Sequence, residues 1–297
     1  MCGIVGIFLK NKELHSQLGS LFSPMLTEMG DRGPDSSGFA IYRDKIEDEF
    51  KVTLHSSSKN LNWNEVEKLI NSKLKLSVKI SKISSHAIFK TKLEPEEIRK
   101  FINSNFKDIN ITSVGKSLEI YKEVGMPLDV LEQFNVINMI GSHMIGHTRM
   151  ATESAVTTEG AHPFNTGSDL CLVHNGSLSN HNNLRRTLVK DGIEFKSQND
   201  TEVAAGYISN SLKNKTSLKD TLTNGLKDLD GFYTFITGTQ KGFAVLRDEI
   251  ACKPAVIAET KDYVAIASEF QAMAHLPDVN KANIYEPKPG VVYSWGS

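Results

Sequence analysis

The chain has 297 residues, enough for one large domain or for one domain with a sizeable insert, because a single core stops growing at about 250–300 residues. Hydrophobic residues make up 39%, charged residues 23%, and the formal net charge is -1. This balance excludes a disordered chain and one that coats nucleic acid. No apolar run approaches the roughly 20 residues that cross a bilayer, and no leader precedes a cleavage site, so we expect a cytoplasmic protein without a membrane partner.

The first predicted elements are a buried strand and a helix. Residues 2–9 form an apolar run (CGIVGIFL), in which glycines at positions 3 and 6 indicate a close approach to the backbone. Apolar residues from Leu14 to Met29 then follow a helical period, with a kink expected at Pro24. The pattern ends in the charged loop 30–35.

A stretch of different composition follows, from about Asp44 to Met139, and is rich in Lys, Ser and Asn. Within it we predict a strand at 87–91, a helix from Pro95, and strands at 109–112 and 118–121. This order predicts a small inserted α+β subdomain over residues 44–139. Lysines at 73, 75, 79 and 82 alternate with apolar residues, which favours the solvated face of a strand over a phosphate-binding patch.

The second half of the chain predicts three helices and then short strands. One helix is capped by Ser179 and stops at Gly192, a second begins near Asn199, and a third carries leucines from 218 to 226. Strands are predicted at 232–237, 242–246, 255–258 and 263–267. Because helices and strands occur in separate runs, we predict an α+β fold with layered antiparallel sheets.

The three cysteines, Cys2, Cys171 and Cys252, are spread over the whole chain without a CxxC spacing or a neighbouring His pair. This pattern predicts neither a disulfide nor a zinc site, and we expect no bound metal. Cys171 lies in an apolar run and Cys252 in a turn, so both are interpreted as structural thiols. Cys2 differs because it follows the initiator methionine.

The position of Cys2 indicates a nucleophile. Initiator methionine is normally removed before a small residue, and the new terminus then carries a thiol and an α-amine on one residue. The α-amine has an ordinary pKa of about 7.7–8.0, so its neutral fraction can accept the thiol proton, directly or through a water. No separate catalytic histidine is then required. The alternative interpretation is that Cys2 is only the second residue of a buried strand.

Further residues offer chemistry that suits a small zwitterionic substrate. Arg149 supplies a guanidinium fork that can pair with a free carboxylate. Asn175 and Gly176 end an apolar strand with a carboxamide donor and an approachable backbone N–H, which favours an oxyanion hole. Asp200 could receive a substrate ammonium or cap the following helix. Taken singly, Arg149 is also typical of a surface salt bridge, and Asn-Gly of a hairpin turn.

Six short motifs occupy the two ends of the chain. They are Met1-Cys2-Gly3-Ile4-Val5-Gly6, Arg32-Gly33-Pro34-Asp35-Ser36-Ser37-Gly38, Gly146-His147-Thr148-Arg149, Ala161-His162-Pro163, His174-Asn175-Gly176 and Asn199-Asp200-Thr201-Glu202. In this order they resemble the class-II glutamine amidotransferases, which are N-terminal nucleophile hydrolases. The resemblance covers residues 1–43 and about 140–297. It implies a four-layer αββα sandwich into which residues 44–139 are inserted.

The resemblance also implies the reaction. Cys2 would attack the side-chain amide of L-glutamine, and Asn175 with the Gly176 N–H would hold the oxyanion. After ammonia leaves, hydrolysis of the thioester would release glutamate.

Roles in substrate binding follow from the same resemblance. Arg149 would pair with the α-carboxylate of glutamine and Asp200 with its α-ammonium. Arg32 would order the pocket around the terminus. Thr152 and His162 match positions of the pocket wall.

The branch of the family is indicated by length and by departures from the common motifs. Met150, Glu153 and Asp31 stand where other residues are common in the glucosamine-phosphate, purine and asparagine branches. Length, insert and opening sequence most resemble the stand-alone glutaminase subunit of multi-subunit glutamate synthases, including N-methylglutamate synthases. This implies an ammonia-accepting synthase subunit with flavin and iron–sulfur centres, and no cofactor on this chain, which lacks the cysteines for a cluster.

Other readings remain open. The chain could be the glutaminase component of another amidotransferase, such as a phosphoribosyl-amine or asparagine-forming enzyme. It could also hydrolyse a different amide, or be a non-catalytic scaffold of the same fold. Neither the charge nor the motifs indicate a nucleic-acid partner.

Overall fold

The computed structural model describes residues 2–58, 60–151 and 155–296. The strands are β1 (Gly3–Leu9), β2 (Ser36–Tyr42), β3 (Phe50–Ser56), β4 (Ser81–Ile83), β5 (His86–Thr91), β6 (Ile109–Gly115), β7 (Leu118–Val124), β8 (His143–Arg149), β9 (Phe164–Gly167), β10 (Leu170–Leu178), β11 (Gly231–Thr239), β12 (Gly242–Arg247), β13 (Val256–Glu259), β14 (Tyr263–Ala267), β15 (Asn283–Tyr285) and β16 (Tyr293–Trp295). The α-helices are α1 (Leu18–Glu28), α2 (Trp63–Leu74), α3 (Pro95–Asn105), α4 (Pro127–Gln133), α5 (His181–Lys190), α6 (Asp200–Lys213) and α7 (Leu218–Asp228).

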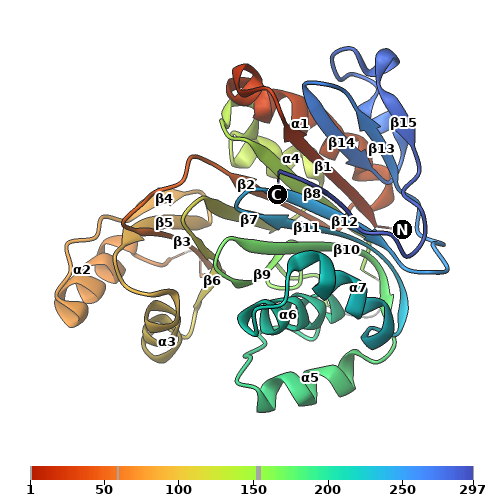
Figure 1. The fold of residues 1–297 in the computed structure, drawn as a ribbon. Helices are drawn as coiled ribbons and strands as arrows, with labels where there is room; N and C mark the ends of the chain where they lie inside the picture. The colour runs from red at the N-terminus through yellow and green to blue at the C-terminus, as the bar shows by residue number, and fades with distance from the viewer. Residues whose placement is uncertain (1, 59, 152–154, 297) are drawn as a thin grey trace.

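The described strands form three sheets, shown in Figure 1. A seven-stranded sheet has the order β15-β13-β14-β1-β8-β2-β7, and a five-stranded sheet the order β16-β12-β11-β10-β9. A smaller four-stranded sheet has the order β4-β5-β3-β6. The neighbours pair antiparallel, as in β1 with β8 and β10 with β11.

The two larger sheets pack face to face, with helices on their outer faces. Along β1, Val5 and Ile7 pack with α1 in one core cluster, whereas Ile4 packs between the sheets. Along β10, Val173 belongs to the core between the sheets and Leu172 to the core under α6 and α7. Alternate side chains of one strand therefore serve two cores, which explains the uninterrupted apolar runs. The predicted four-layer αββα sandwich is confirmed.

The four-stranded sheet occupies residues 50–115 and has its own core with α2 and α3. The strand predicted at 118–121 is β7, but it pairs with β2 at the edge of the seven-stranded sheet. Together with α4, residues 118–133 thus belong to the main sandwich. The separate sheet ends earlier than the boundary expected at Met139.

Several local predictions differ from the structure. The expected strand around the lysines 73 to 82 is instead the end of α2, a left-handed C-cap at Lys75 (φ 53°), and a short strand from Ser81. Ser179 does not cap α5, because the N-cap of this helix is Asn180. The Ser179 hydroxyl donates to the Asp230 carboxylate instead. Within the described part of the chain, no helix is long and apolar enough to cross a membrane.

Candidate active site

Cys2 lies immediately before β1, at the edge where β1 meets the end of β8. Gly3 pairs with Thr148, which places Cys2 beside the end of β8. The Cys2 side chain is half-buried, and Sγ lies 3.8 Å from the carbonyl oxygen of Met150. A β-carbon at Gly3 would stand 2.8 Å from atoms of Met29 and Thr148. The glycine after the thiol is thus required by the close packing of the loop before β2.

The backbone carbonyl of Cys2 is held by two side chains from distant elements. Arg32 donates to it from Nε at 3.1 Å, and Asn175 donates from Nδ2 at 3.1 Å. Arg32 also forms an ion pair with Glu269, which follows β14. Three segments far apart in sequence therefore converge on the predicted nucleophile.

Asn175 and Gly176 lie within β10 rather than in a hairpin turn. They pair with Thr234 and Tyr233 of β11, and the strand continues to Leu178. Gly176 has a φ of +146°, and a β-carbon there would approach the carbonyl oxygen of Phe232 to 2.0 Å. Only glycine fits this position. Asn175 is 2% exposed, so its carboxamide is positioned by packing from all sides.

Arg149 is the last residue of β8 and is 6% exposed. Its Nη1 donates to the carbonyl oxygen of Ala155 at 3.2 Å. The loop 30–35 packs onto the same strand end: the Asp35 N–H donates to the Arg149 carbonyl at 3.0 Å. A β-carbon at Gly33 would lie 2.4 Å from the Thr148 carbonyl carbon. Arg149 is therefore a buried side chain near Cys2, and the alternative of a surface salt-bridge residue does not apply.

Asp200 is the first residue of α6, but the helix is capped by its neighbour. The Asn199 side chain accepts from the Thr201 N–H at 2.8 Å, as an N-cap does. The Asp200 carboxylate accepts instead from the Leu178 N–H at 2.8 Å and lies 3.8 Å from Nδ1 of His174. It is thus directed toward β10, and its side chain remains 22% exposed.

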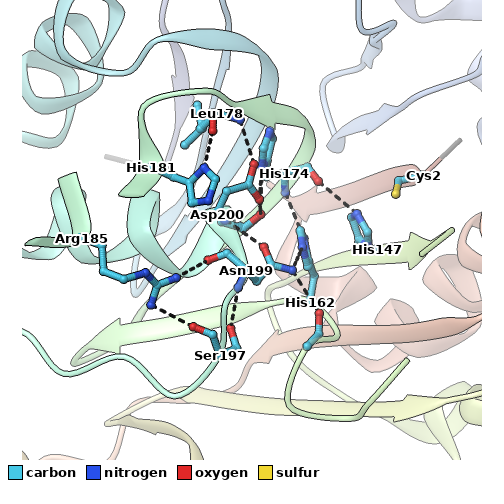
Figure 2. Close-up of polar contacts among 12 residues, drawn as sticks. Cys2, His147, His162, His174, Leu178, His181, Arg185, Ser197, Asn199 and Asp200 are labelled. Atoms are coloured by element: carbon cyan, nitrogen blue, oxygen red, sulfur yellow. Dashed lines mark hydrogen bonds and ion pairs between the residues drawn. The ribbon is translucent and has the colours of Figure 1, made fainter. Parts of the chain in front are cut away.

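Three buried histidines connect these elements, as Figure 2 shows. His147 and His162 stack with ring centroids 3.9 Å apart, and the His147 ring nitrogen Nε2 lies 3.0 Å from the carbonyl oxygen of His174. His174 contacts the Thr201 hydroxyl through Nδ1 at 2.9 Å. Burial lowers the pKa of His147 to about 3 and also lowers the pKa values of His162 and His174. These rings are therefore neutral at pH 7 and support β10 rather than carry charge.

The predicted site residues differ in how directly they contact Cys2. Cys2, Arg32 and Asn175 are in direct contact. His162 stacks on the ring of His147. Nδ1 of His162 also accepts a hydrogen bond from the backbone N–H of His174 at 3.4 Å. Thr152 falls outside the described residues.

Glu269 and Ser268 also belong to the site, although no pattern in the sequence indicates them. Glu269 pairs with Arg32 across 237 residues, and the Ser268 hydroxyl accepts from the Ile4 N–H at 3.0 Å. His147 and His174 lie inside the motifs, but nothing in the motifs alone indicates their mutual contact. Among the described residues there is no group of three or more His, Cys, Asp or Glu side chains arranged to hold a metal.

Comparison with known proteins places this geometry in a family. Residues 147–275 match the family described as glutamine amidotransferase domain. The glutamine amidotransferase-like protein GlxB of Rhizobium meliloti (strain 1021) is 52% identical over 99% of this chain and 98% of its own length. A relative from Methanothermobacter thermautotrophicus, whose name also contains glutamine amidotransferase, is 31% identical over 99% of both chains.

Solved structures show the same fold. The B. subtilis glutamine phosphoribosylpyrophosphate amidotransferase, complexed with ADP and GMP, superposes with a TM-score of 0.63 at 21% identity. The match covers 99% of this chain and 47% of that chain. The 52% identity to GlxB over nearly the whole of both chains shows that the chain belongs to the glutamine amidotransferases. The fold agrees with the class-II assignment that the motif order predicts.

Proposed function

We propose that this chain hydrolyses the side-chain amide of L-glutamine at Cys2 and releases glutamate and ammonia. The observation that carries the proposal is the convergence of Arg32 and Asn175 on the Cys2 carbonyl, both at 3.1 Å. This contact holds a carboxamide donor beside a half-buried thiol. A nucleophile beside a fixed donor is the arrangement that acyl transfer requires.

The reaction needs Met1 to be removed, because only then is the Cys2 nitrogen an amine. The amine accepts the thiol proton and the sulfur attacks the amide carbon, so that a C–S bond forms as the carbonyl becomes an oxyanion. One N–H of the Asn175 amide is used by the Cys2 carbonyl; the other and the Gly176 N–H would stabilise the oxyanion. The C–N bond then breaks as the amine returns its proton to the leaving ammonia, and water hydrolyses the thioester.

Substrate selection is assigned to Arg149 and Asp200. Arg149 is buried at the end of β8, next to the residue whose carbonyl contacts the Cys2 thiol. The Asp200 carboxylate accepts a hydrogen bond from the N–H of Leu178. Leu178 ends β10 and follows Asn175 by three residues. One cation at the end of β8 and one anion at the end of β10 suit the two opposite charges of a free amino acid.

The activity test compares glutamine with glutaramate, which has the same amide but no α-ammonium. We expect glutamate release from glutamine, loss of it in Cys2→Ala, and loss of it when an uncleaved extension precedes Cys2. Full activity with the extension would contradict the N-terminal mechanism, and equal rates with glutaramate would contradict the role of Asp200.

The ammonia is proposed to pass to a synthase subunit of the glutamate synthase type that carries flavin and iron–sulfur centres. Two relatives match this chain over 98% and 99% of their own length, which supports an acceptor on a separate chain. By contrast, the chain spans 31% of the glutamine–fructose-6-phosphate aminotransferase of Methanosarcina mazei, to which it is 33% identical.

A second candidate is the glutaminase component of another amidotransferase. It is favoured by the 31% identity over 62% of this chain to the amidophosphoribosyltransferase of Methanocaldococcus jannaschii. Affinity purification of the full chain from its native cell separates the two. A co-purifying flavoprotein that accelerates glutamine hydrolysis supports the first proposal, and a phosphoribosyl- or aspartate-binding partner without flavin supports the second.

A further inference from the structure

A cavity of about 430 Å³ lies between the four-stranded sheet with α3 and the main sandwich, and the Cys2 site does not contribute to its lining. Its walls come from α3 and β6 on one side and from the segment before β9, the loop after α5 and helix α6 on the other. Figure 1 shows α3 next to α6, and the ion pair between Lys213 and Glu96 at 3.3 Å joins the two helices.

Two cations face this cavity with only neutral acceptors as close partners. Lys122 is 7% exposed, and its ammonium donates to the carbonyl oxygens of Ala161 at 2.7 Å and Glu159 at 3.1 Å. It also lies 4.5 Å from the ring centroid of Phe164. Arg99 donates from Nη2 to the carboxamide oxygen of Asn165 at 2.7 Å. Within the described part of the chain, neither cation has a carboxylate within ion-pair distance.

The carboxylates of the lining are used locally instead. Glu202 accepts from the N–H groups of Lys196 and Ser197, both at 2.8 Å. Glu159 accepts from the Asn110 carboxamide at 3.2 Å, and Glu194 from Asn103 at 3.0 Å. These bonds keep the carboxylates out of direct ion pairs with the two cations, but the carboxylates stay charged: Glu202 and Glu159 act on Lys122 at longer range, and Glu96 and Glu194 act on Arg99. The lining still carries a cationic excess, because Arg99, Lys100, Lys122, Lys196 and Lys213 face these four carboxylates.

A buried ammonium without a direct ion pair carries a desolvation cost that carbonyl dipoles and more distant carboxylates offset only in part. Burial lowers the pKa of Lys122 to about 8, which reflects this cost. An anion in the cavity would offset it, and the carboxamides of Asn103, Asn110 and Asn165 supply hydrogen bonds to hydroxyl or amino groups of the same molecule.

We propose that this cavity binds a small anionic metabolite, whose phosphate or carboxylate group pairs with Lys122 and Arg99. The volume suits a molecule of metabolite size, at the lower end of ordinary ligand pockets. Such a ligand contacts α3 and β9 at once and therefore holds the four-stranded sheet against the sandwich. The site is separate from glutamine hydrolysis, and its test does not depend on that activity.

The test is titration calorimetry of the full chain with inorganic phosphate, glycerol 3-phosphate and succinate as probes, supported by thermal unfolding with each probe. We expect saturable binding of at least one probe. Binding of a phosphate probe but not of succinate identifies a phosphate ligand. Binding of succinate alone identifies a carboxylate ligand. Lys122→Met and Arg99→Gln should each weaken binding by about tenfold or more, because a charged hydrogen-bond partner is lost.

The matched control is Lys227→Met on the exposed side of α7, which should bind as the wild type does. Arg99→Gln decides the question if Lys122→Met does not fold, since Arg99 is only half-buried. Absence of saturable binding by all three probes, or equal affinity in the wild type and in the folded cavity variants, overturns the proposal.

Discussion

Asn175 donates from Nδ2 to the carbonyl oxygen of Cys2 at 3.1 Å, although 173 residues separate them in the chain. The contact joins the two larger sheets at their edge, because Cys2 precedes β1 and Asn175 lies on β10. The group assigned to the oxyanion is thus fixed to the backbone of the nucleophile itself.

Asn175→Ala removes the proposed oxyanion donor and the bond to Cys2. We expect kcat for glutamine hydrolysis to fall about 100- to 1000-fold, as loss of one oxyanion donor does elsewhere. Steady-state kinetics with a thermal unfolding check measure this. The control Asn224→Ala lies on the exposed side of α7 and should leave kcat unchanged. A kcat within threefold of wild type in folded Asn175→Ala would remove the residue from the mechanism.

Arg149→Lys and Asp200→Asn each remove one proposed contact with the free amino acid. We expect kcat/KM to fall by the equivalent of about 2–5 kcal/mol in Asp200→Asn, because the substrate ammonium is then left unpaired. Arg149→Lys should also lower kcat/KM. Arg149→Lys keeps the charge but loses the planar fork. The ratio of kcat/KM between variant and wild type is the measurement, and wild-type efficiency in either variant contradicts the assignment.

Arg32 and Glu269 form an ion pair whose two members should differ in importance. The Glu269 side chain is 47% exposed, so Glu269→Gln should cost less than about 1 kcal/mol in stability and activity. Arg32→Gln also removes the donor to the Cys2 carbonyl and should lower kcat/KM more. Kinetics and denaturant unfolding of both variants give the comparison. Equal losses would mean that Arg32 acts only through Glu269.

Gly176 and Gly192 provide a matched pair of left-handed glycines. Both have positive φ, +146° and +85°, but a β-carbon at Gly176 meets a carbonyl oxygen at 2.0 Å whereas one at Gly192 meets nothing within 4 Å. Gly192→Ala should cost about 1 kcal/mol from backbone strain alone. Gly176→Ala should cost several kcal/mol and abolish activity. Urea unfolding measures both, and similar losses would contradict the close approach seen here.

Stability should fall as the pH decreases from 7 to 5. Burial lowers the pKa values of His143 and His147 to about 3, whereas in the unfolded chain they are about 6.5. Below pH 6.5 the unfolded chain therefore binds protons that the folded chain does not, which lowers the free energy of unfolding by about 2 kcal/mol per histidine at pH 5. His143→Gln should lose about 2 kcal/mol less than wild type between these pH values. An identical loss contradicts the prediction.

The regular elements were predictable where one pattern dominates. The apolar run of residues 2–9 is β1, and the helix from Pro95 is α3, since proline at the first helical position and a periodic apolar face agree. The lysines between 73 and 82 do not form the predicted strand, because alternation over a few residues also fits a helix end followed by an extended loop. Lys75 ends α2 in a left-handed conformation that its residue type does not indicate.

The site was predictable only as far as the motifs reach. Position 2 and the residue types of Asn175 and Arg149 indicate their chemistry, but their approach to one another depends on sheet registers such as Gly3 with Thr148. The pairing of Arg32 with Glu269 has no local signal, because it depends on where β14 ends. The sequence alone leaves open whether Asp200 caps α6, and in the structure the cap is Asn199.

Intact-mass spectrometry with a glutamine-analogue electrophile shows directly whether Cys2 is the nucleophile. We predict a chain without Met1 that gains one adduct, mapped by peptide analysis to Cys2. Cys252, which is exposed, serves as the control: Cys252→Ser should still be labelled once, and Cys2→Ala should not be labelled. Retention of Met1 in active protein, or an adduct on Cys252 with Cys2 unmodified, would contradict the assignment of Cys2 as the nucleophile.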